Sequence, residues 1–212
     1  MASGIEFKTS MSFSYGEPAG LGPGVVRLVA ENPGPFTFKG TNTYIVGSTE
    51  LAVIDPGPDD EKHIGDILRV AAGRPITHIL ITHTHRDHVD NAAALKAVTG
   101  ALTAGYSRGH VSRGTIASSP SGTEFVDIEF APDIELAHGD VLSGADWSMT
   151  ALHTPGHAPD HICYALDGRE ILFSGDHVMA WNTTVVAPPE GRMADYLTSL
   201  QILLGRPERT YL

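Results

Sequence analysis

The feature that most restricts what this chain can fold into is a short polar segment, Thr82–Asn91, that directly follows the apolar run Ile79–Ile81. An apolar run followed by polar residues indicates a buried strand that ends in a loop. The segment places three histidines and one aspartate close together in sequence: His83, His85, Asp87 and His88. Imidazole nitrogens and a carboxylate spaced this closely are the donors that zinc and similar divalent ions bind. A metal-binding loop is therefore favoured over a solvated polar loop.

Two later segments repeat the arrangement of a strand followed by a candidate ligand. His157 lies in a turn after the apolar stretch Trp147–Leu152, and Asp176 lies in a Gly-Asp-His turn after Ile171–Phe173. In layered α/β folds the ends of such strands form one rim, where ligands bind. We therefore expect the three segments to converge and to supply more donors than one loop offers.

The ordered motifs resemble those of the metallo-β-lactamase superfamily, in its hydrolase branch with glyoxalase II-like motifs. The matching segments are Val53–Gly57, Thr82–His88, Thr154–His157 and Phe173–His177, and the resemblance covers nearly the whole chain from about Thr41 onward. It implies an α/β fold of four layers, αββα, in which two sheets lie between outer helices.

The resemblance also implies a binuclear metal site with zinc as the expected cofactor. By motif, His83, His85 and His157 resemble the ligands of the first metal. Asp87 and His88 resemble ligands of the second metal.

The resemblance implies a bridging role for one aspartate and a supporting role for another, and a third aspartate is a candidate catalytic residue. Asp176 resembles the carboxylate that bridges both metals, and Asp55 resembles the residue that holds the ligand loop in place. Asp87 lies beside the expected water and is the candidate base or orienting group.

One expected ligand has no counterpart in the sequence. The family has a final metal-ligand histidine, usually in a Pro-Gly-His-Gly turn after the last strand, but here the chain ends at Arg209–Leu212 and no histidine follows His177. We therefore expect the C-terminal part of the fold to be truncated and the second metal to lack one protein ligand. His177 is a candidate replacement, although adjacent residues on an extended segment, such as Asp176 and His177, point to opposite faces.

Length and hydrophobic periodicity predict a single domain over residues 1–212. A chain of 212 residues is long enough for one well-buried core. Residues 1–24, with the glycine-rich stretch Gly20–Gly24, are predicted to be a flexible lead-in. A helical stripe of apolar residues predicts a helix over Asp59–Ala72. The other main elements predicted are strands at Val25–Ala30, Thr43–Val46, Leu51–Ile54 and Ile79–Ile81, and helices at Val89–Val98 and Met193–Leu204, the last with Leu197, Leu200 and Leu204 on one side.

Several side chains near the motifs are open to two interpretations. His153 and His161 either line the substrate pocket or are structural, hydrogen-bonded residues. Trp181 and Asn182 either contact substrate or pack the rim. Cys163, the one cysteine, lies in a predicted strand and is expected to fill the core, since unpaired cysteines are usually buried.

Net charge and sequence patterns limit which classes of binding partner we expect. The formal net charge of −11 argues against broad nucleic-acid binding, which relies on Lys and Arg neutralising phosphates. Arg86, Arg108 and Arg113 either form a local basic patch beside the site, which would help to hold a short RNA, or, as the favoured interpretation, are solvated surface residues. Arg108–Gly122 is predicted to be an irregular loop. The chain has neither a secretory signal pattern nor an apolar run that would span a membrane, so we expect a cytoplasmic protein without a membrane partner. A homo-oligomer is compatible with the sequence.

The expected chemistry is metal-assisted hydrolysis. A catalytic zinc lowers the pKa of its water to about 7, so hydroxide is available without a protein nucleophile. A small-molecule thioester, ester or lactone is the favoured substrate. The run Thr183–Gly191 and the following Tyr196–Leu200 are similar to a narrower group that contains many uncharacterised bacterial hydrolases and a mitochondrial lactamase-like endoribonuclease. Two alternatives therefore stay open: a metal-dependent endoribonuclease on single-stranded RNA, and a metal-binding but catalytically impaired fragment without the final histidine.

Overall fold

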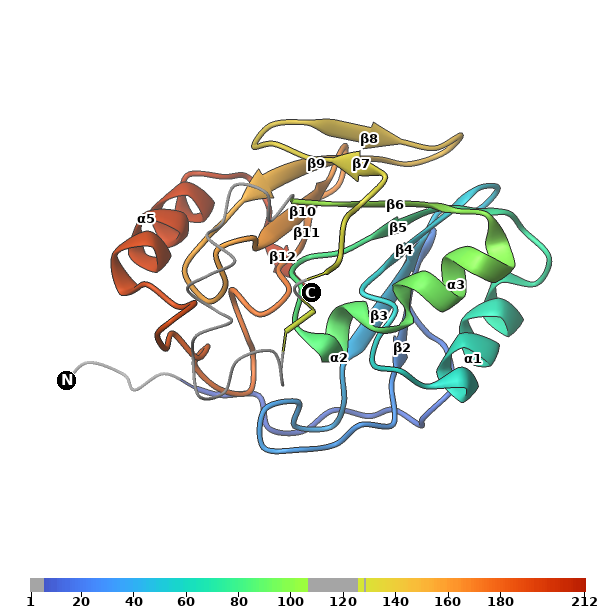
Figure 1. Ribbon diagram of the computed structural model, residues 1–212, viewed down its shortest axis with the longest axis horizontal. Coiled ribbons are helices and arrows are strands. Elements are labelled where there is room, and N and C mark those ends of the chain that lie inside the picture. The colour runs from blue at the N-terminus through green and yellow to red at the C-terminus, as the bar shows by residue number, and fades with distance from the viewer. Residues whose placement is uncertain (1–5, 107–125, 128) are drawn as a thin grey trace.

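The computed structural model describes residues 6–106, 126–127 and 129–212, and two β-sheets stack face to face at its centre (Figure 1). Helices α1 (Glu61–Ala71) and α3 (Asn91–Thr99) cover the outer side of one sheet, and α5 (Met193–Leu204) flanks the other. This order of layers confirms the predicted αββα fold.

The first sheet changes from antiparallel to parallel pairing part-way across. Its seven strands lie in chain order: β1 (Ala19–Gly22), β2 (Val25–Val29), β3 (Asn42–Val46), β4 (Leu51–Ile54), β5 (Ile76–Leu80), β6 (Leu102–Gly105) and β7 (Ile134–Glu135). Strands β1 to β4 are joined as antiparallel neighbours, whereas β4 to β7 pair in parallel. Parallel neighbours need crossover connections, and α1 lies in the connection from β4 to β5 and α3 in the connection from β5 to β6. The loop after β5 therefore emerges at the carboxyl edge of the parallel strands, where ligands bind in such sheets.

The second sheet has five strands in the order β12-β11-β10-β9-β8. Their bounds are β8 (Val141–Ser143), β9 (Ser148–His153), β10 (Ile162–Leu166), β11 (Ile171–Phe173) and β12 (Thr210–Tyr211). Its strands are antiparallel except for the β11–β12 pair. The β9–β10 connection contains His157, and the turn after β11 contains Asp176.

Large apolar side chains fill the space between the sheets. Tyr44, Trp147 and Phe173 belong to this cluster, and the rings of Tyr44 and Phe173 lie 5.1 Å apart. A separate cluster under α1 and α3 includes Ile67 and Leu95, both with 0% exposure. Full burial of each such side chain stabilises the fold by roughly 1.5–3 kcal/mol. The two clusters therefore fix the sheets, and with them the loops at their common edge.

The helical segment after the metal loop differs from its prediction. The single helix predicted over Val89–Val98 is divided into a short α2 (Arg86–Val89) and α3, because the backbone N–H of Asn91 donates to the carbonyl of Gly57 instead of continuing the first helix. Helix α1 begins at Glu61, two residues after the predicted start, and the side chain of Asp60 caps it by accepting a hydrogen bond from the backbone N–H of Lys62.

Part of the predicted lead-in is ordered. Residues 19–22 form β1, which pairs with β2 in an antiparallel hairpin in which Ala19 lies opposite Arg27. Gly24 has a φ of 70°, a conformation that glycine adopts at little cost in a tight turn. The predicted lead-in therefore ends in a strand and a turn, because the open edge of β2 provides pairing partners that the local sequence does not show.

Helix α5 has the predicted bounds but buries another face. Leu197 and Leu204 are 53% and 84% exposed, whereas Ser199 and Leu203 are buried. The hydroxyl of Ser199 donates to the carbonyl of Pro155, which holds this face against the loop before His157. Contact with that loop, rather than the leucine spacing, decides the rotation of the helix.

The remaining sequence predictions concern the single cysteine, the Gly- and Ser-rich segment and membrane-spanning helices. Cys163 is buried in β10 as expected, and burial raises the pKa of its thiol to about 12. Arg108–Gly122 lies outside the described residues. Within the described ranges, none of the helices combines the length and apolar character that a membrane crossing requires.

Candidate metal centre

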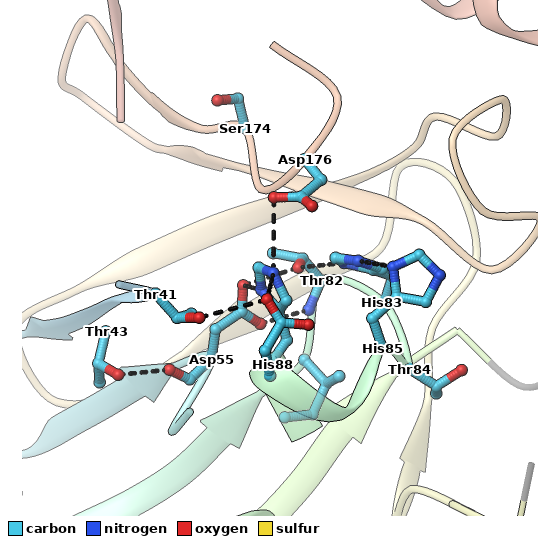
Figure 2. Close-up of polar contacts among 12 residues, drawn as sticks. Thr41, Thr43, Asp55, Thr82, His83, Thr84, His85, His88, Ser174 and Asp176 are labelled. Carbon is cyan, nitrogen blue, oxygen red and sulfur yellow. Dashed lines mark hydrogen bonds and ion pairs between the residues drawn. The ribbon is translucent and has the colours of Figure 1, made fainter. Parts of the chain in front are cut away.

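The three motif segments meet at one edge of the two sheets. The loop after β5 brings His83, His85 and His88, and the turn after β11 brings Asp176 above them (Figure 2). His157 comes from the β9–β10 connection. The convergence that the strand ends predicted is therefore present.

Four of the predicted ligands form a tight cluster. His83, His85, His157 and Asp176 each offer one ligand atom, and all four atoms lie within 4.8 Å of one another. Nδ1 of His85 lies 2.9 Å from Nε2 of His83 and 3.0 Å from Nε2 of His157. These nitrogens converge on one point, as the donors of a first ion must.

The remaining two predicted ligands lie beside this cluster. Nε2 of His88 is 3.4 Å from Oδ2 of Asp87 and 3.5 Å from Oδ1 of Asp176. The other oxygen of Asp176, Oδ2, is 3.6 Å from Nε2 of His157. Asp176 thus presents one oxygen to each group of donors, as a bridging carboxylate would.

Asp55 holds the ligand loop from below. Its carboxylate accepts hydrogen bonds from the backbone N–H and the hydroxyl of Thr82, at 2.8 and 2.7 Å, and lies 2.8 Å from Nδ1 of His88 (Figure 2). Asp55 itself has a φ of 49°, which is uncommon for a residue other than glycine and marks a constrained position. These contacts fix the orientation of His88.

Each histidine of the first cluster is held through its other ring nitrogen, as metal-binding histidines usually are. Nδ1 of His157 lies 2.7 Å from the carbonyl of Val185. Nε2 of His85 lies 3.0 Å from Oε2 of Glu190. In His83, Nδ1 is 3.0 Å from the Thr82 hydroxyl.

Sequence reasoning missed three supporting residues. Besides Glu190, the side chain of Asp160 accepts hydrogen bonds from the backbone N–H and the hydroxyl of Thr84 in the ligand loop. The hydroxyl of Thr41 lies 3.3 Å from Oδ2 of Asp87. The one signal in the sequence was the run Thr183–Gly191, which contains Glu190 and marked the segment but not the contact.

Burial and neighbouring rings favour the neutral form of two histidines of the first cluster, His83 and His157. Burial, followed by the nearby histidines His88 and His85, lowers the pKa of His83 well below its usual value. Burial and His85 also lower the pKa of His157. Because a metal binds the neutral imidazole, both rings are in the binding form at neutral pH. Three imidazoles and one carboxylate fit a zinc-like divalent ion.

The second group of donors has the opposite electrostatics. Burial alone would lower the pKa of His88, but the carboxylates of Asp87, Asp55 and Asp176 surround the ring and raise that pKa well above its usual value. Although burial opposes ionisation of Asp176, the facing His88 and His157 lower the pKa of its carboxyl. A cation is therefore favoured between these carboxylates.

Other histidines near the motifs face away from the donors. The ring of His177 lies against His161 and Tyr196, and both its nitrogens lack a hydrogen-bond partner among the described residues. It does not belong to the cluster of donors found in the described chain. His153 stacks on Tyr106 and bonds to the loop carbonyl of residue 159, so its role is structural. His161 is fully buried behind the ring of His83.

A cavity of about 300 Å³ opens beside the donors. Asp87, His88 and Asp176 contribute to its lining, as do the rings of Phe38 and Trp181. These two rings are stacked with their centroids 4.9 Å apart. Trp181 therefore both packs the rim and borders the cavity, whereas Asn182 is exposed.

The sequence pattern of the Metallo-beta-lactamase superfamily matches residues 36–212, a range that contains all six predicted ligands. The chain belongs to the metallo-β-lactamase superfamily. The order of its layers and the position of the cluster at the sheet edge agree with this membership.

The chain is similar in sequence to two curated proteins and in structure to a solved one. A lactamase-like protein of Pestalotiopsis microspora is 34% identical over 170 residues, which are 78% of this chain and 47% of that protein. An atrochrysone carboxyl ACP thioesterase of Aspergillus chevalieri is 33% identical over 184 residues, 85% of this chain and 53% of that protein. This metallo-β-lactamase chain thus spans about half the length of these curated relatives. Among solved structures, TTHA1623 in a di-iron-bound form is 26% identical with a TM-score of 0.65, covering 85% of this chain and 88% of that one.

Proposed function

We propose that this chain is a metal-dependent hydrolase that cleaves small-molecule thioesters, esters or lactones with an activated water. One observation carries the proposal: a cluster of three imidazoles and a carboxylate lies beside a cavity that Asp87, His88 and Asp176 help to line. Donors next to a small cavity are what such chemistry requires, since water and substrate must reach the same point.

The ligand roles are part of this proposal. His83, His85, His157 and Asp176 would hold the first ion. The carboxylate of Asp176 would also serve a second ion, together with Asp87 and His88. A bound divalent ion supplies Lewis-acid chemistry, because it polarises a carbonyl and makes water acidic enough to yield hydroxide near pH 7.

Asp87 is the proposed catalytic residue. Its side chain is 31% exposed and lines the cavity, while its Oδ2 is held by the hydroxyl of Thr41 at 3.3 Å. A carboxylate held in this way orients an attacking water and accepts its proton. Asp55, which is buried and bonded to His88, would keep the neighbouring ligand in position.

The substrate class rests on charge and on relatives. A net charge of −11 disfavours extended nucleic acid. Of the three arginines considered for a basic patch, Arg86 is paired with Asp90 at 3.3 Å, and Arg108 and Arg113 lie outside the described residues. Several relatives carry the name atrochrysone carboxyl ACP thioesterase, which supports a thioester.

A parallel activity screen with measured metal content tests the proposal. The metal-loaded protein is offered a short acyl thioester, an aryl ester, a γ-lactone and a single-stranded RNA. Hydrolysis of at least one of the first three, lost in a His83→Ala/His85→Ala variant and kept in His138→Ala, is the expected result. Metal-dependent cleavage of RNA alone would instead support the endoribonuclease. Stoichiometric metal without turnover of any substrate would support an impaired protein.

Zinc is the proposed metal. Three imidazoles and a carboxylate suit zinc, whereas the related TTHA1623 was solved in a di-iron-bound form. Elemental analysis of protein purified without added chelator decides between them. Iron in excess of zinc would contradict this part of the proposal and leave the hydrolase proposal to its own test.

A further inference from the structure

A positively charged side chain, that of Arg27, lines the cavity beside the metal donors, and the described part of the chain provides no ion-pair partner for it. Arg27 on β2 is half-buried and lines the cavity, and its Nε is buried without a hydrogen-bond partner among the described residues. An unpaired buried polar group costs free energy comparable to a lost hydrogen bond. A ligand group that accepts from this guanidinium would remove that cost.

The position of Arg27 connects it with the proposed reaction centre. Arg27 pairs with Tyr44 across β2 and β3. The nearby charge of Arg27 counteracts part of the rise that burial causes in the pKa of Tyr44. Thr41, directly before β3, contacts Asp87. Arg27, Thr41 and Asp87 all line the same cavity.

The other charges around the cavity do not neutralise Arg27. The carboxylate of Asp55 is bonded to Thr82 and His88, and Asp176 faces His88 and His157. These carboxylates serve the proposed metal site, so neither of them is a partner for the guanidinium.

Besides Arg27, two lysines line the cavity from exposed positions. Lys39 lies over the ring of Phe38, with its Nζ 5.1 Å from the centroid, and Lys8 is exposed near the start of the described chain. They add positive charge at the entrance, whereas Arg27 is the half-buried one. Oδ1 of Asn42, another buried cavity atom, also lacks a partner among the described residues, so the cavity favours a polar ligand.

We propose that Arg27 binds a carboxylate on the acyl part of the substrate, so that the enzyme prefers thioesters or esters of dicarboxylic acids. The planar guanidinium matches a carboxylate through two parallel hydrogen bonds. The stacked Phe38 and Trp181 border the same cavity and would cover the apolar chain between the two ends of the acyl group. This inference rests on the proposed hydrolase function, and it adds the substrate's charge and the residue that recognises it.

A pair of substrates that differ only in charge tests the preference. A glutaryl thioester of a neutral thiol is compared with its primary-amide analogue, and kcat/KM is measured for both. Because hydrogen bonds to charged groups contribute about 1.5–3 kcal/mol, wild-type protein is expected to prefer the carboxylate by about tenfold or more. Arg27→Met should remove most of this preference, and Arg27→Lys should keep part of it.

Two controls separate Arg27 from a general charge effect. Arg169→Met removes an exposed arginine that does not line the cavity, and the preference should persist. Lys39→Met removes a cation at the entrance. Loss of the preference in Lys39→Met but not in Arg27→Met would overturn the assignment, as would an equal preference in Arg27→Met and wild type.

A binding measurement keeps this inference distinct from the hydrolase proposal. Calorimetric titration of the metal-loaded protein with glutarate and with butyrate compares a second carboxylate with none. Glutarate should bind wild type about tenfold more tightly than butyrate, and Arg27→Met should lose that advantage while its thermal melt stays close to that of wild type. If glutarate has no advantage in wild type, the inference is wrong whether or not thioesters are hydrolysed. If the advantage is present but no thioester is cleaved, only the hydrolase proposal fails.

Discussion

Oε2 of Glu190 lies 3.0 Å from Nε2 of His85, on the ring nitrogen that faces away from the cluster. The two residues are 105 positions apart in sequence, and both side chains are largely buried. A carboxylate at this position fixes which nitrogen of His85 carries the proton and leaves Nδ1 free to bind a metal. Glu190 would therefore position His85 in the proposed first site.

Replacing that carboxylate should weaken the first metal. Glu190→Gln is expected to lower the affinity for the ion by about 10–100-fold, because partners of metal-binding histidines contribute on that scale. Competition with a calibrated chelator measures it. Glu135→Gln, an exposed position on β7, is the matched control and should bind metal as wild type does. Equal affinities for all three proteins would show that Glu190 does not hold His85.

Removing two ligands should abolish binding at the first site. In the His83→Ala/His85→Ala variant, two of the four donors of the cluster are gone, and one imidazole with one carboxylate does not hold a transition ion at micromolar concentration. Elemental analysis should find about one ion or more per wild-type chain, and the variant should contain about one ion fewer. His138→Ala, which alters an exposed loop histidine, should match wild type. Equal metal content in the double variant would rule out this cluster.

Substitution of the two aspartates that line the cavity, Asp87 and Asp176, should have different effects on turnover and on metal affinity. Asp87→Asn is expected to lower kcat by about 10²–10⁴-fold, while affinity for the first ion changes little, because the proposed role of Asp87 is proton transfer. Asp176→Asn should lower both, since its two oxygens face His157 and His88. Turnover and chelator competition on the same samples separate the effects. An Asp87→Asn protein with normal turnover would contradict the catalytic assignment.

Metal binding at the second site should strengthen as pH rises. The pKa of His88 is raised, so its ring carries a proton at neutral pH that a metal must displace. Affinity at this site should therefore increase by up to about tenfold per pH unit until pH exceeds that pKa. The pKa values of His83 and His157 are lowered, so their protonation takes no affinity from the first site between pH 7 and 9. Titration of apoprotein with zinc at three pH values checks this, and two sites with parallel pH profiles would contradict it.

The contact between α5 and the loop of His157 should be sensitive to one methyl group. Gly156 has a φ of 146°, and a Cβ there would overlap the backbone of Tyr196 on α5. Gly156→Ala should lower the free energy of unfolding by roughly 1–3 kcal/mol, as overpacking does, and should also weaken the first metal. Gly168→Ala is the control for backbone strain, because Gly168 has a φ of 71° with open space around it. Denaturant unfolding compares them, and equal losses would show that the Tyr196 contact is unimportant.

The sequence by itself determined those features of this protein that depend on neighbouring residues, namely the ligand loop and the strands that precede the loops. His83, His85, Asp87 and His88 lie within one loop, so their proximity follows from chain connectivity and needs no distant contact. The strands feeding the loops were visible as apolar runs because burial on both faces removes polar residues from them. Motif order then indicated the αββα layers, which the structure confirms.

Only the tertiary structure decided how distant segments meet. The contact of Glu190 with His85, the place of Arg27 in the cavity and the buried face of α5 each depend on packing between elements far apart in sequence. The pairing of β1 with the edge of β2 also depends on packing, because the unpaired N–H and C=O groups of an edge strand can pair with any neighbouring extended segment. Periodicity reports which side of an element is apolar, but the partner that covers it, and the polar side chains brought to the same point, follow from the closure of the whole fold.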